Sequence, residues 1–288
     1  MTTLLPEPVD PTAAGMAGTR TDPWSEAEAA ASRAGVTVRA LHGIDEMRAA
    51  SAVLDQIWDA DDGTPQVEPR LMVALAEAGG YLAGALDGDQ FVAAAVGFPR
   101  HPTGLHSHIA GVIPASSNRG VGTALKLHQR AWCLDRGIPT VTWTFDPLVA
   151  RNAHLNLTRL GATVEKYLID VYGPMNDALN RDDQSDRLLV RWDLASSGRR
   201  KPDDLGGELL VVERGGVPVS KPLEPGPIAP ERLLVGVPPD IESLRRTNHE
   251  AAKRWRLAVR DALSPALDAG WVVEGFDRTG HYVLEGPR

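Results

Sequence analysis

The chain has 288 residues, 43% of them hydrophobic and 24% charged, and a formal net charge of −8. Such a composition is ordinary for a globular protein of one large or two modest domains. No apolar run approaches the roughly 20 residues that cross a bilayer, and an acidic chain without a basic run is poorly suited to nucleic acid. We therefore expect neither a membrane nor a nucleic acid as a partner.

Two further features bear on the compartment. The first residues include acidic side chains and prolines, without the charged and then apolar order of a secretory signal. The one cysteine, Cys133, excludes an internal disulfide and suits a reducing environment. Together they favour the cytoplasm.

The N-terminal third predicts a tail, a strand, two helices and a hairpin. Residues 1–34 are rich in Ala, Thr, Pro and Glu with little periodicity, which is typical of a mobile tail, although a short helix could follow Pro23. The apolar patterns that follow place a strand over 36–41, helices over 44–58 and 68–78, and a hairpin of strands over 81–86 and 91–98.

A strand, a glycine loop and a helix come next. The strand covers 105–112 and ends before Pro114, and the helix runs to about Arg136, where Gly137 and Pro139 stop it. Between them lies the loop Ser117-Asn118-Arg119-Gly120-Val121-Gly122-Thr123.

The glycine loop is suited to binding phosphate. Gly120 and Gly122 have no Cβ, so the backbone can bend and turn several N–H groups toward one anion at the positive end of the helix. Two other phosphate loops are excluded by spacing, because Leu125 replaces the third glycine of G-x-G-x-x-G and the G-K-[ST] of a P-loop is absent.

The rest of the chain predicts a completed first domain and a smaller second unit. A strand over 139–145, a helix over 152–162 and strands over 163–172 and 187–194 are followed by a polar linker over 196–206. Beyond it we expect strands over 208–213, 233–237, 271–276 and 282–284, and one helix over 241–269 that Pro265 breaks or kinks. This accessory lobe either shapes a substrate pocket or only stabilises the first domain.

The loop resembles the [QR]-x-x-G-x-[GA] loop of GCN5-related N-acetyltransferases (GNAT), which grips the pyrophosphate of coenzyme A. Ser117 stands where that family has Gln or Arg. The order of strand, loop, helix, strand and helix also matches over roughly 36–194. The resemblance implies an α/β (α+β) fold with a mixed, mostly antiparallel sheet flanked by helices over 35–195, and an accessory α+β lobe over 207–288.

The resemblance also implies a cosubstrate, acetyl-CoA or another acyl-CoA such as succinyl-CoA, and no metal. In the family the strand before the loop splays and frees an amide for the thioester carbonyl, and Val112 matches that position, beside a Gly111 that suits a bulge. The residues that match the cosubstrate site are Val112, Ser117, Asn118, Arg119, Gly120, Val121, Gly122, Thr123, Asn152 and Asn156.

A histidine pair is the candidate base. Acyl transfer to an amine needs a group that takes its proton, and the imidazole of His is suited to that role near neutral pH. His106 and His108 lie two apart on the predicted strand and so face the same side. Relatives carry a glutamate or two histidines there, but both side chains could instead be structural. Metal binding by His-x-His lacks a nearby Cys or carboxylate.

The proton donor for the leaving thiolate is not evident. Many relatives place a tyrosine near the end of the next helix, where this chain has Leu157. Tyr172 is our candidate, with Tyr167 as the alternative, although either could simply pack in the sheet.

The long polar connection before the last strand of the first domain is the candidate acceptor site. Arg187 could bind a carboxylate with two hydrogen bonds, and Asp186 or Asp177 could hold an ammonium group. Ordinary surface charge is the alternative.

Together these patterns predict a cytoplasmic acyl-CoA-dependent N-acyltransferase acting on a small amine or amino acid. The alternative is a CoA-binding or regulatory protein without turnover. The oligomeric state, including a homodimer, stays open.

Overall fold

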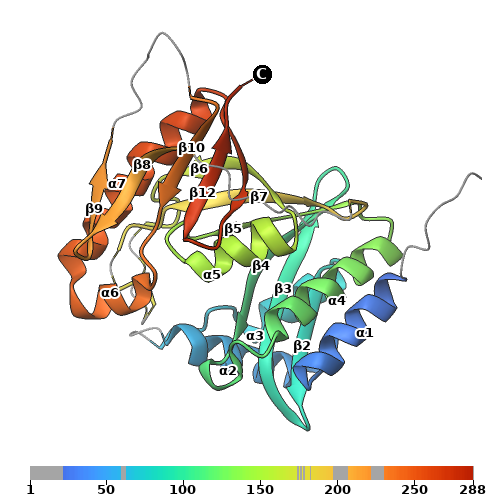
Figure 1. The fold of residues 1–288 in the computed structure, drawn as a ribbon. Coiled ribbons are helices and arrows are strands. Elements are labelled where there is room, and N and C mark those ends of the chain that lie inside the picture. Colours follow the sequence, from blue (N-terminus) through green and yellow to red (C-terminus); the bar gives the residue numbers. More distant parts are fainter. Residues whose placement is uncertain are drawn as a thin grey trace, which may run out of the picture.

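The structure is a computed structural model that describes residues 22–59, 63–173, 175, 177, 179–181, 183–196, 207–221 and 230–287. Within them the chain forms two sheets, a larger one with helices on both faces and a smaller one near the C-terminus (Figure 1). Most of the predicted tail, residues 1–21, and nearly all of the predicted linker lie outside the described residues.

The larger sheet is mixed and mostly antiparallel, as expected. Its order is β1-β2-β3-β4-β5-β7-β6, and every neighbouring pair is antiparallel except the parallel β4–β5 pair. The strands are β1 (Thr37–Ala40), β2 (Tyr81–Asp87), β3 (Gln90–Arg100), β4 (Gly104–Val112), β5 (Thr140–Phe145), β6 (Thr163–Leu168) and β7 (Arg187–Asp193).

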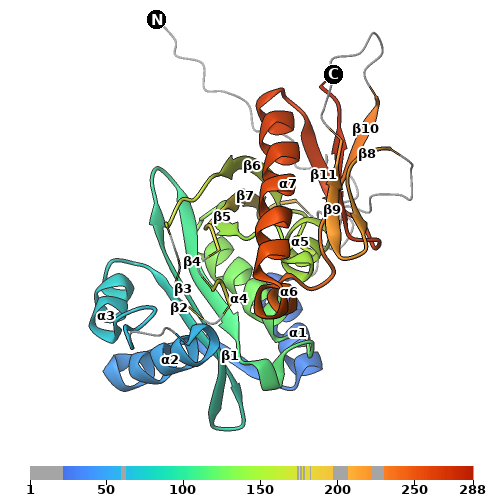
Figure 2. The same ribbon diagram turned by 90° about the vertical axis from the view of Figure 1, so that its left-hand side faces the viewer.

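Helices cover the two faces of this sheet (Figure 2). On one face are α2 (Gly43–Trp58) and α3 (Pro69–Glu77); on the other are α1 (Pro23–Ala34) and α4 (Val121–Asp135), which follows a short 3-10 turn, η1 (Pro114–Ser116). Gly111 marks the α2 face, since a Cβ on it would lie 2.7 Å from a ring carbon of Trp58. Val112 marks the α4 face, where its Cγ2 lies 3.9 Å from the Cβ position of Gly122.

The short helix that could follow Pro23 is present as α1 and is packed, so the prediction of a mobile tail was wrong for residues 23–34. Asp22 caps it by accepting a hydrogen bond from the Ser25 amide, 2.9 Å away. The small side chains Ala27, Ala30, Ala31 and Ala34 are buried, and the helix packs on α4. Alanine has little hydrophobic surface, so the sequence showed only a weak periodicity here.

The helix predicted over 152–162 is shorter and partly irregular. It consists of α5 (Ala150–Ala153) and a π-helical turn, η2 (His154–Arg159), in which the Leu160 amide donates to the Leu155 carbonyl five residues back. Such turns are frequent at functional sites. The next strand, β6, ends at Leu168, four residues earlier than predicted, because a turn closed by a bond from the Gly173 amide to the Asp170 carbonyl follows it.

The accessory lobe has its own sheet, in the order β11-β12-β10-β8-β9. Its elements are β8 (Glu208–Arg214), β9 (Val217–Ser220), β10 (Arg232–Gly236), α6 (Ile241–Thr247), α7 (His249–Asp268), β11 (Val272–Phe276) and β12 (His281–Glu285). The sequence did not predict β9, which contains Pro218. A proline is tolerated there because β9 is an edge strand with one side unpaired.

The single predicted lobe helix is two helices, and the break is not at the proline. Asn248 ends α6 and caps α7, its side chain accepting from the Ala251 amide at 3.1 Å. Pro265 lies inside α7, which continues to Asp268. Of the predicted break or kink at Pro265, the break was therefore wrong.

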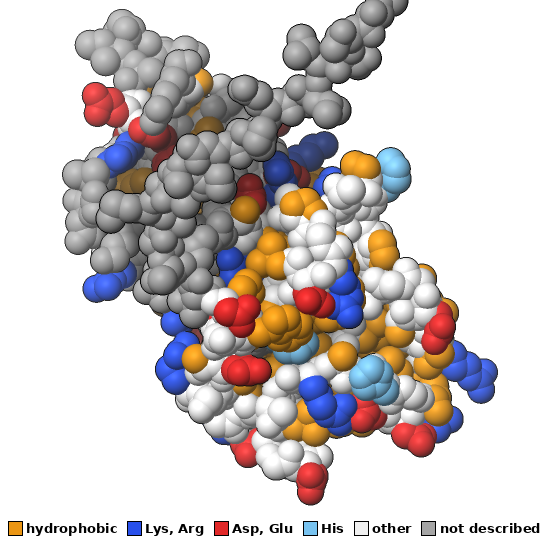
Figure 3. All heavy atoms as spheres, turned by 90° about the vertical axis from the view of Figure 1, so that its right-hand side faces the viewer, with side chains coloured by type: hydrophobic (Ala, Val, Ile, Leu, Met, Phe, Trp, Pro, Cys, Tyr) orange, Lys and Arg blue, Asp and Glu red, His pale blue; other side chains and the backbone are white. Residues whose placement is uncertain are grey.

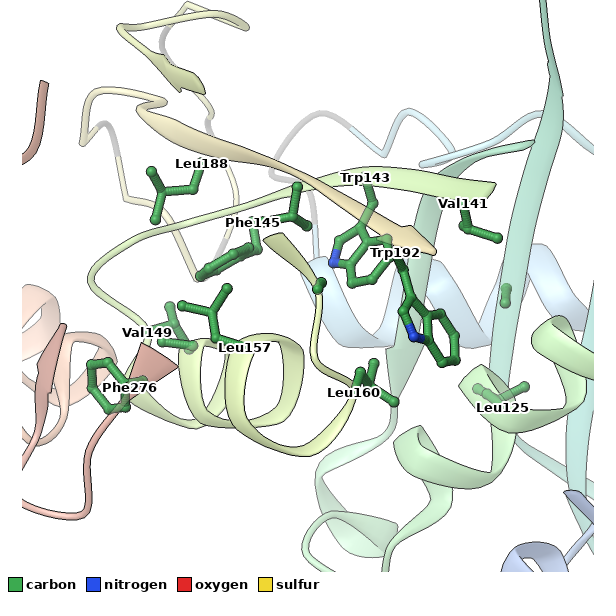
Figure 4. Packing of buried hydrophobic residues seen from close by; sticks show 14 of the residues in the cluster. Leu125, Val141, Trp143, Phe145, Val149, Leu157, Leu160, Leu188, Trp192 and Phe276 are labelled. Atoms are coloured by element: carbon green, nitrogen blue, oxygen red, sulfur yellow. The ribbon is translucent and has the colours of Figure 1, made fainter. Parts of the chain in front are cut away.

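One hydrophobic core joins the two parts. Leu157 of η2 lies beside Phe145 and Val149, close to Phe276 from the lobe (Figure 4). Helix α7 contacts both β6 and the smaller sheet, and β11 contacts β6 and η2. The lobe is thus packed against the β6 end of the larger sheet.

Figure 3 views the molecule from the side where α1 and α4 lie in Figure 1. Over the described part of that face, basic and acidic side chains are interspersed among neutral and hydrophobic ones. The described part of that face therefore shows no continuous basic stripe of the kind that tracks a phosphate backbone.

Candidate active site

The parallel strands β4 and β5 separate along their length. Their register includes only Gly104↔Thr140, Leu105↔Val141 and His106↔Thr142 among the described residues. Beyond this point β4 continues beside β3, and β5 beside β7. The strands therefore leave a wedge between them at their carboxyl ends, which we call the β4–β5 wedge.

The Val112 amide points into the β4–β5 wedge. Successive N–H groups of a strand point to opposite edges, and the next amide, that of Ile113, donates to Val92 on the β3 side at 2.9 Å.

A β-bulge is present in β4, at a different residue from the one expected. His108 is the extra residue, because Val96 pairs with Ile109 whereas Gly97 pairs with Ser107. The register is regular at Gly111, where a Cβ would come within 2.8 Å of Ile57 as well as meeting Trp58. Gly111 is therefore required by the packing of α2 and not by a bulge.

The glycine loop forms an open cradle at the start of α4. Gly120 is the N-cap, with a left-handed φ of 92°, and no side chain caps the helix. A Cβ on Gly120 would have only Ala34 nearby, at 4.0 Å, and one on Gly122 only Val112, at 3.9 Å. The first intrahelical bond runs from Ala124 to Gly120, so the preceding first-turn amides are available to a ligand. This arrangement fits a phosphate group.

The remaining loop side chains mainly support its shape. Arg119 donates to Asp87 at 2.8 Å and to the Ala34 carbonyl at 3.2 Å, which ties the loop to β2 and α1. Ser117 donates to the Ile113 carbonyl at 3.3 Å. Asn118 has a left-handed φ of 63°. Val121 is buried and Thr123 is half-buried, so ligand contacts from this loop would come chiefly from its backbone.

Asn152 and Asn156 lie in α5 and η2. Asn152 is half-buried, and Asn156 is 5% exposed, with its carbonyl accepting from the Ala162 amide at 2.9 Å. Leu157 is 1% exposed and part of the core in Figure 4. It offers no hydroxyl at the position where the resembled family has a tyrosine.

The two strand histidines share one face, as predicted. Both rings flank Phe98, with centroid distances of 5.2 Å for His106 and 5.8 Å for His108, and Nδ1 of His106 lies 3.2 Å from Oγ1 of Thr142. Burial lowers the pKa of His106 to about 4, with a smaller contribution from the charge of His108, and burial also lowers the pKa of His108. Both imidazoles are therefore neutral near neutral pH and able to accept a proton.

Polar residues continue from the histidines across the same face. Thr144 follows Thr142 on that face of β5, and its Oγ1 lies 3.1 Å from the Tyr172 hydroxyl. The Arg187 guanidinium lies 5.7 Å from the Tyr172 ring centroid. We call these five residues, His106, Thr142, Thr144, Tyr172 and Arg187, the polar strip.

Asp186 and Tyr167 lie outside the polar strip. Asp186 is fully buried and accepts hydrogen bonds from the Tyr167 hydroxyl at 2.7 Å and from Arg260 at 2.8 and 2.7 Å. Burial, together with the charge of Asp186, raises the pKa of Tyr167. Asp177 is bound to its own loop, accepting from the side chain of Asn180 at 2.7 Å. None of these three groups is free to meet a substrate here.

A buried ionic cluster that sequence reasoning missed joins the lobe to the sheet. Asp146, directly after β5, and Asp183 are bridged by Arg245 of α6 and Arg256 of α7, with N–O distances of 2.6–2.9 Å. All four side chains are nearly inaccessible. Arg256 and Arg260 lie four apart on one predicted helix, which was the available signal for a shared charged face.

Lys126 is a second buried charge that the sequence did not single out. From α4 its Nζ donates to Ser107 at 3.0 Å and to Gln129 at 3.2 Å, and it lies 4.0 Å from the Trp143 ring centroid. Burial lowers its pKa to about 7. It bridges β4 and β5 on the face opposite the polar strip.

Within the described ranges, no group of three potential metal-binding side chains gathers, and no helix combines the length and apolarity needed to cross a membrane.

No family model and no curated protein sequence matches the chain, whereas solved structures do. The ribosomal-protein-S18-alanine N-acetyltransferase from Escherichia coli is 15% identical, with a TM-score of 0.45 over 59% of this chain and 99% of that one. A GNAT family acetyltransferase from Elizabethkingia anophelis with acetyl-CoA bound is 14% identical, with a TM-score of 0.42 over 55% and 98%. The acetyltransferase of GNAT family from Streptococcus pneumoniae is 14% identical, with a TM-score of 0.43 over 54% and 97%. The last two are described as members of the family that the glycine loop resembles.

Proposed function

We propose that the protein is an acyl-CoA-dependent N-acyltransferase of the GNAT type that acylates a small amine or amino acid. One observation carries the proposal: the open glycine cradle at the start of α4 stands beside the end of the β4–β5 wedge, into which the Val112 amide points. An anion-binding helix start next to a free amide suits a thioester that carries a pyrophosphate.

The cradle would hold the pyrophosphate through the first-turn amides of α4, including those of Val121, Gly122 and Thr123. Acyl-CoA would supply the activated acyl group. The Val112 amide would stabilise the thioester oxygen as it gains charge, a contribution that is large when the donor is already oriented. Asn152 and Asn156 would contact the rest of the cosubstrate from α5 and η2.

The histidine pair would take the proton of the attacking amine. Both imidazoles are neutral near neutral pH, and His108 comes two residues after His106, the last residue of β4 that pairs with β5. Because His106 already contacts Thr142, the proton would pass more readily through His108 or through water between the rings.

Tyr172 is the proposed donor to the departing thiolate. Its side chain is 49% exposed, and its hydroxyl reaches the sheet at Thr144. Tyr167 is less suited, because its hydroxyl already donates a hydrogen bond to Asp186.

Thiol release tests the proposal. Acetyl-CoA and succinyl-CoA would each be incubated with a panel of amines and amino acids, and free CoA and acylated product measured together. Stoichiometric release of both products is the expected result; no product with any donor and acceptor would contradict it.

A CoA-binding protein without turnover is the second candidate, favoured by Leu157 at the position of the usual acid and by Ser117 in the loop. Such a protein would bind CoA in calorimetry yet release no thiol in the same panel.

A further inference from the structure

Arg187 stands opposite an aspartate that it does not bind. The antiparallel register of β5 and β7 ends with Phe145↔Leu188, so the next two opposite positions are Asp146 and Arg187. Because side chains alternate along a strand, these two positions share the face of Thr144 and not that of Phe145. Opposite charges directly across two strands normally attract each other. A pair between Asp146 and Arg187 would therefore be the simplest arrangement for this end of the sheet.

The lobe occupies Asp146 instead. Its Oδ1 accepts from Arg256 at 2.8 Å, and its Oδ2 accepts from Arg245 at 2.6 Å and from Arg256 at 2.9 Å. Burial alone would raise the pKa of Asp146, but the charges of Arg256 and Arg245 outweigh it and hold the pKa below its usual range. Asp146 is thus an ionised carboxylate whose partners come from α6 and α7.

Arg187 is left with neutral partners. It donates to the Asp186 carbonyl at 2.9 Å and to the Met175 sulfur at 3.0 Å, and no ion pair joins it to a carboxylate among the described residues. Arg187 as a whole is only 8% exposed to solvent. Burial lowers its pKa, and Asp146 opposes that effect, but a guanidinium stays charged near neutral pH.

The nearby carboxylates of the described residues that form ion pairs have other partners. Asp146 and Asp183 pair with Arg245 and Arg256, and Asp186 pairs with Arg260. Among the described residues, Arg187 is thus left without a carboxylate in ion-pair contact. A buried charge without a counter-ion is unfavourable, so this position is suited to an anion from outside the chain.

The position of Arg187 suggests which anion that is. In the parallel register His106 pairs with Thr142, and with His108 counted as the extra residue of the bulge, Gly111 of β4 comes level with Asp146, across the β4–β5 wedge. Arg187 therefore lies at the level of the proposed thioester site, one strand beyond β5 and on the face of the polar strip. A small substrate reacting in the wedge could reach it with a second group.

We propose that Arg187 binds a carboxylate of the substrate beside the reacting centre, so that the preferred acceptor is an amine carrying a carboxylate, such as an amino acid. This inference rests on the proposed function. The lobe sets the specificity by keeping Asp146 from neutralising Arg187. If the acyl group is itself dicarboxylic, such as succinyl, its free carboxylate would bind Arg187 in the same way.

The test compares amino acids with the amines formed by removing their carboxylate, for example phenylalanine with phenethylamine and leucine with isoamylamine. Their binding to the protein–CoA complex would be measured by calorimetry and their turnover with acetyl-CoA and with succinyl-CoA. We expect the carboxylate-bearing compound of each pair, or the succinyl donor, to be favoured at least about 30-fold, mainly in Kd and KM.

Three variants make the test specific. Arg187→Leu should abolish the preference, and Arg187→Lys should restore part of it because the charge remains while the forked geometry is lost. Arg254→Leu removes an exposed arginine on α7 and the same net charge, and should keep the full preference.

A stability measurement guards against a folding defect. Replacing a buried charge without a counter-ion by a similar apolar side chain is neutral or stabilising, so the melting temperature of Arg187→Leu should be unchanged or higher. A large drop would reveal a structural partner and overturn the inference. Equal affinities within every pair, together with no preference for the succinyl donor, in wild type and Arg187→Leu alike would also overturn it. Absence of thiol release contradicts the proposed function alone, since the calorimetric preference still decides the role of Arg187.

Discussion

At the residue scale, the two strand histidines are kept neutral by the sheet around them. A histidine with a pKa of about 4 loses its proton well below the physiological range, so its own ionisation does not limit activity there. The acceptor amine, which is mostly protonated near neutral pH, then becomes the group whose ionisation matters. This distinguishes a buried histidine base from one exposed to solvent.

The pH dependence of turnover checks this. Between about pH 6 and pH 9, kcat/KM should rise with pH as the acceptor amine loses its proton. An acceptor with a different amine pKa should shift this pH profile accordingly. His106→Ala or His108→Ala should lower the rate about 10²- to 10⁴-fold with unchanged CoA affinity. The control His101→Ala, in the exposed β3–β4 turn, should behave like wild type. Full activity in both single variants would mean that the pair is structural.

A third histidine links pH to the docking of α1. His128 of α4 is 8% exposed, its Nδ1 lies 2.9 Å from the Tyr81 hydroxyl, and its ring packs edge-on against Trp24 of α1. Burial lowers its pKa to about 4, whereas an unfolded chain protonates histidine near 6.5. The stability from this group is therefore complete above about pH 6.5 and is lost as the pH falls toward 4.

We predict that His128→Phe is less sensitive to acid than wild type. Across that pH range the lowered pKa of His128 should reduce the free energy of unfolding by up to about 3 kcal/mol. His106 contributes in the same direction in both proteins. Urea unfolding near neutral pH and near pH 5 measures it, with about 1 kcal/mol or more expected between the two proteins' pH-dependent losses. Equal losses would show that folding does not lower the pKa of His128.

At the element scale, the regular helices and strands were predicted from their periodicity, whereas the irregular features were not. The glycine loop, β4 and α4 followed from residues that act locally, and the histidine face followed from the alternation of a strand. The bulge at His108 depends on which residues β3 presents opposite it, and the packing of α1 depends on alanines that say little on their own. The role of Asp186 depends on Arg260, which is far along the chain.

The α6–α7 junction shows the same limit. A proline inside a helix usually marks its end, yet here the helix ends at Asn248 and runs through Pro265. Whether a break falls at a cap or at a proline is decided by the tertiary contacts of the two segments, which local propensity does not contain.

Two substitutions test the junction. Asn248→Ala removes the bond to the Ala251 amide and should lower the free energy of unfolding by about 1 kcal/mol. Pro265→Ala restores a helical amide and should raise it by about 1 kcal/mol or more. Urea unfolding gives both values. Effects of the opposite sign would place the break in solution at Pro265.

At the scale of the whole molecule, the lobe is held by charge as well as by the core. Arg245 and Arg256 each contact both Asp146 and Asp183, so one cluster fixes α6 and α7 to β5 and to the loop before β7. The sequence separates these partners by up to 110 residues, which is why it did not reveal them.

Breaking this cluster should be costly. Arg256→Met leaves two buried carboxylates with a single guanidinium, and we expect a loss of about 3–5 kcal/mol in the free energy of unfolding. Arg254→Met, the exposed neighbour on α7, should change it by less than about 0.5 kcal/mol. Both are measured by urea unfolding, and hydrogen exchange in α7 would report undocking of the lobe. Similar small effects in both variants would show that the apolar core alone holds the lobe.

The most direct test of acyl-CoA binding is calorimetry at Gly122, since this helical position has room for a side chain, whereas Gly120 has a left-handed φ that any substitution would strain. Gly122→Ala fits the loop pattern of the resembled family and should keep CoA affinity. Gly122→Asp places a carboxylate in the cradle; an acid at a helix start is stabilising, so the variant should fold at least as well while binding CoA about 100-fold or more weakly. If a folded Gly122→Asp protein binds CoA as tightly as wild type and Gly122→Ala, the cradle is not the pyrophosphate site and the proposed function is wrong.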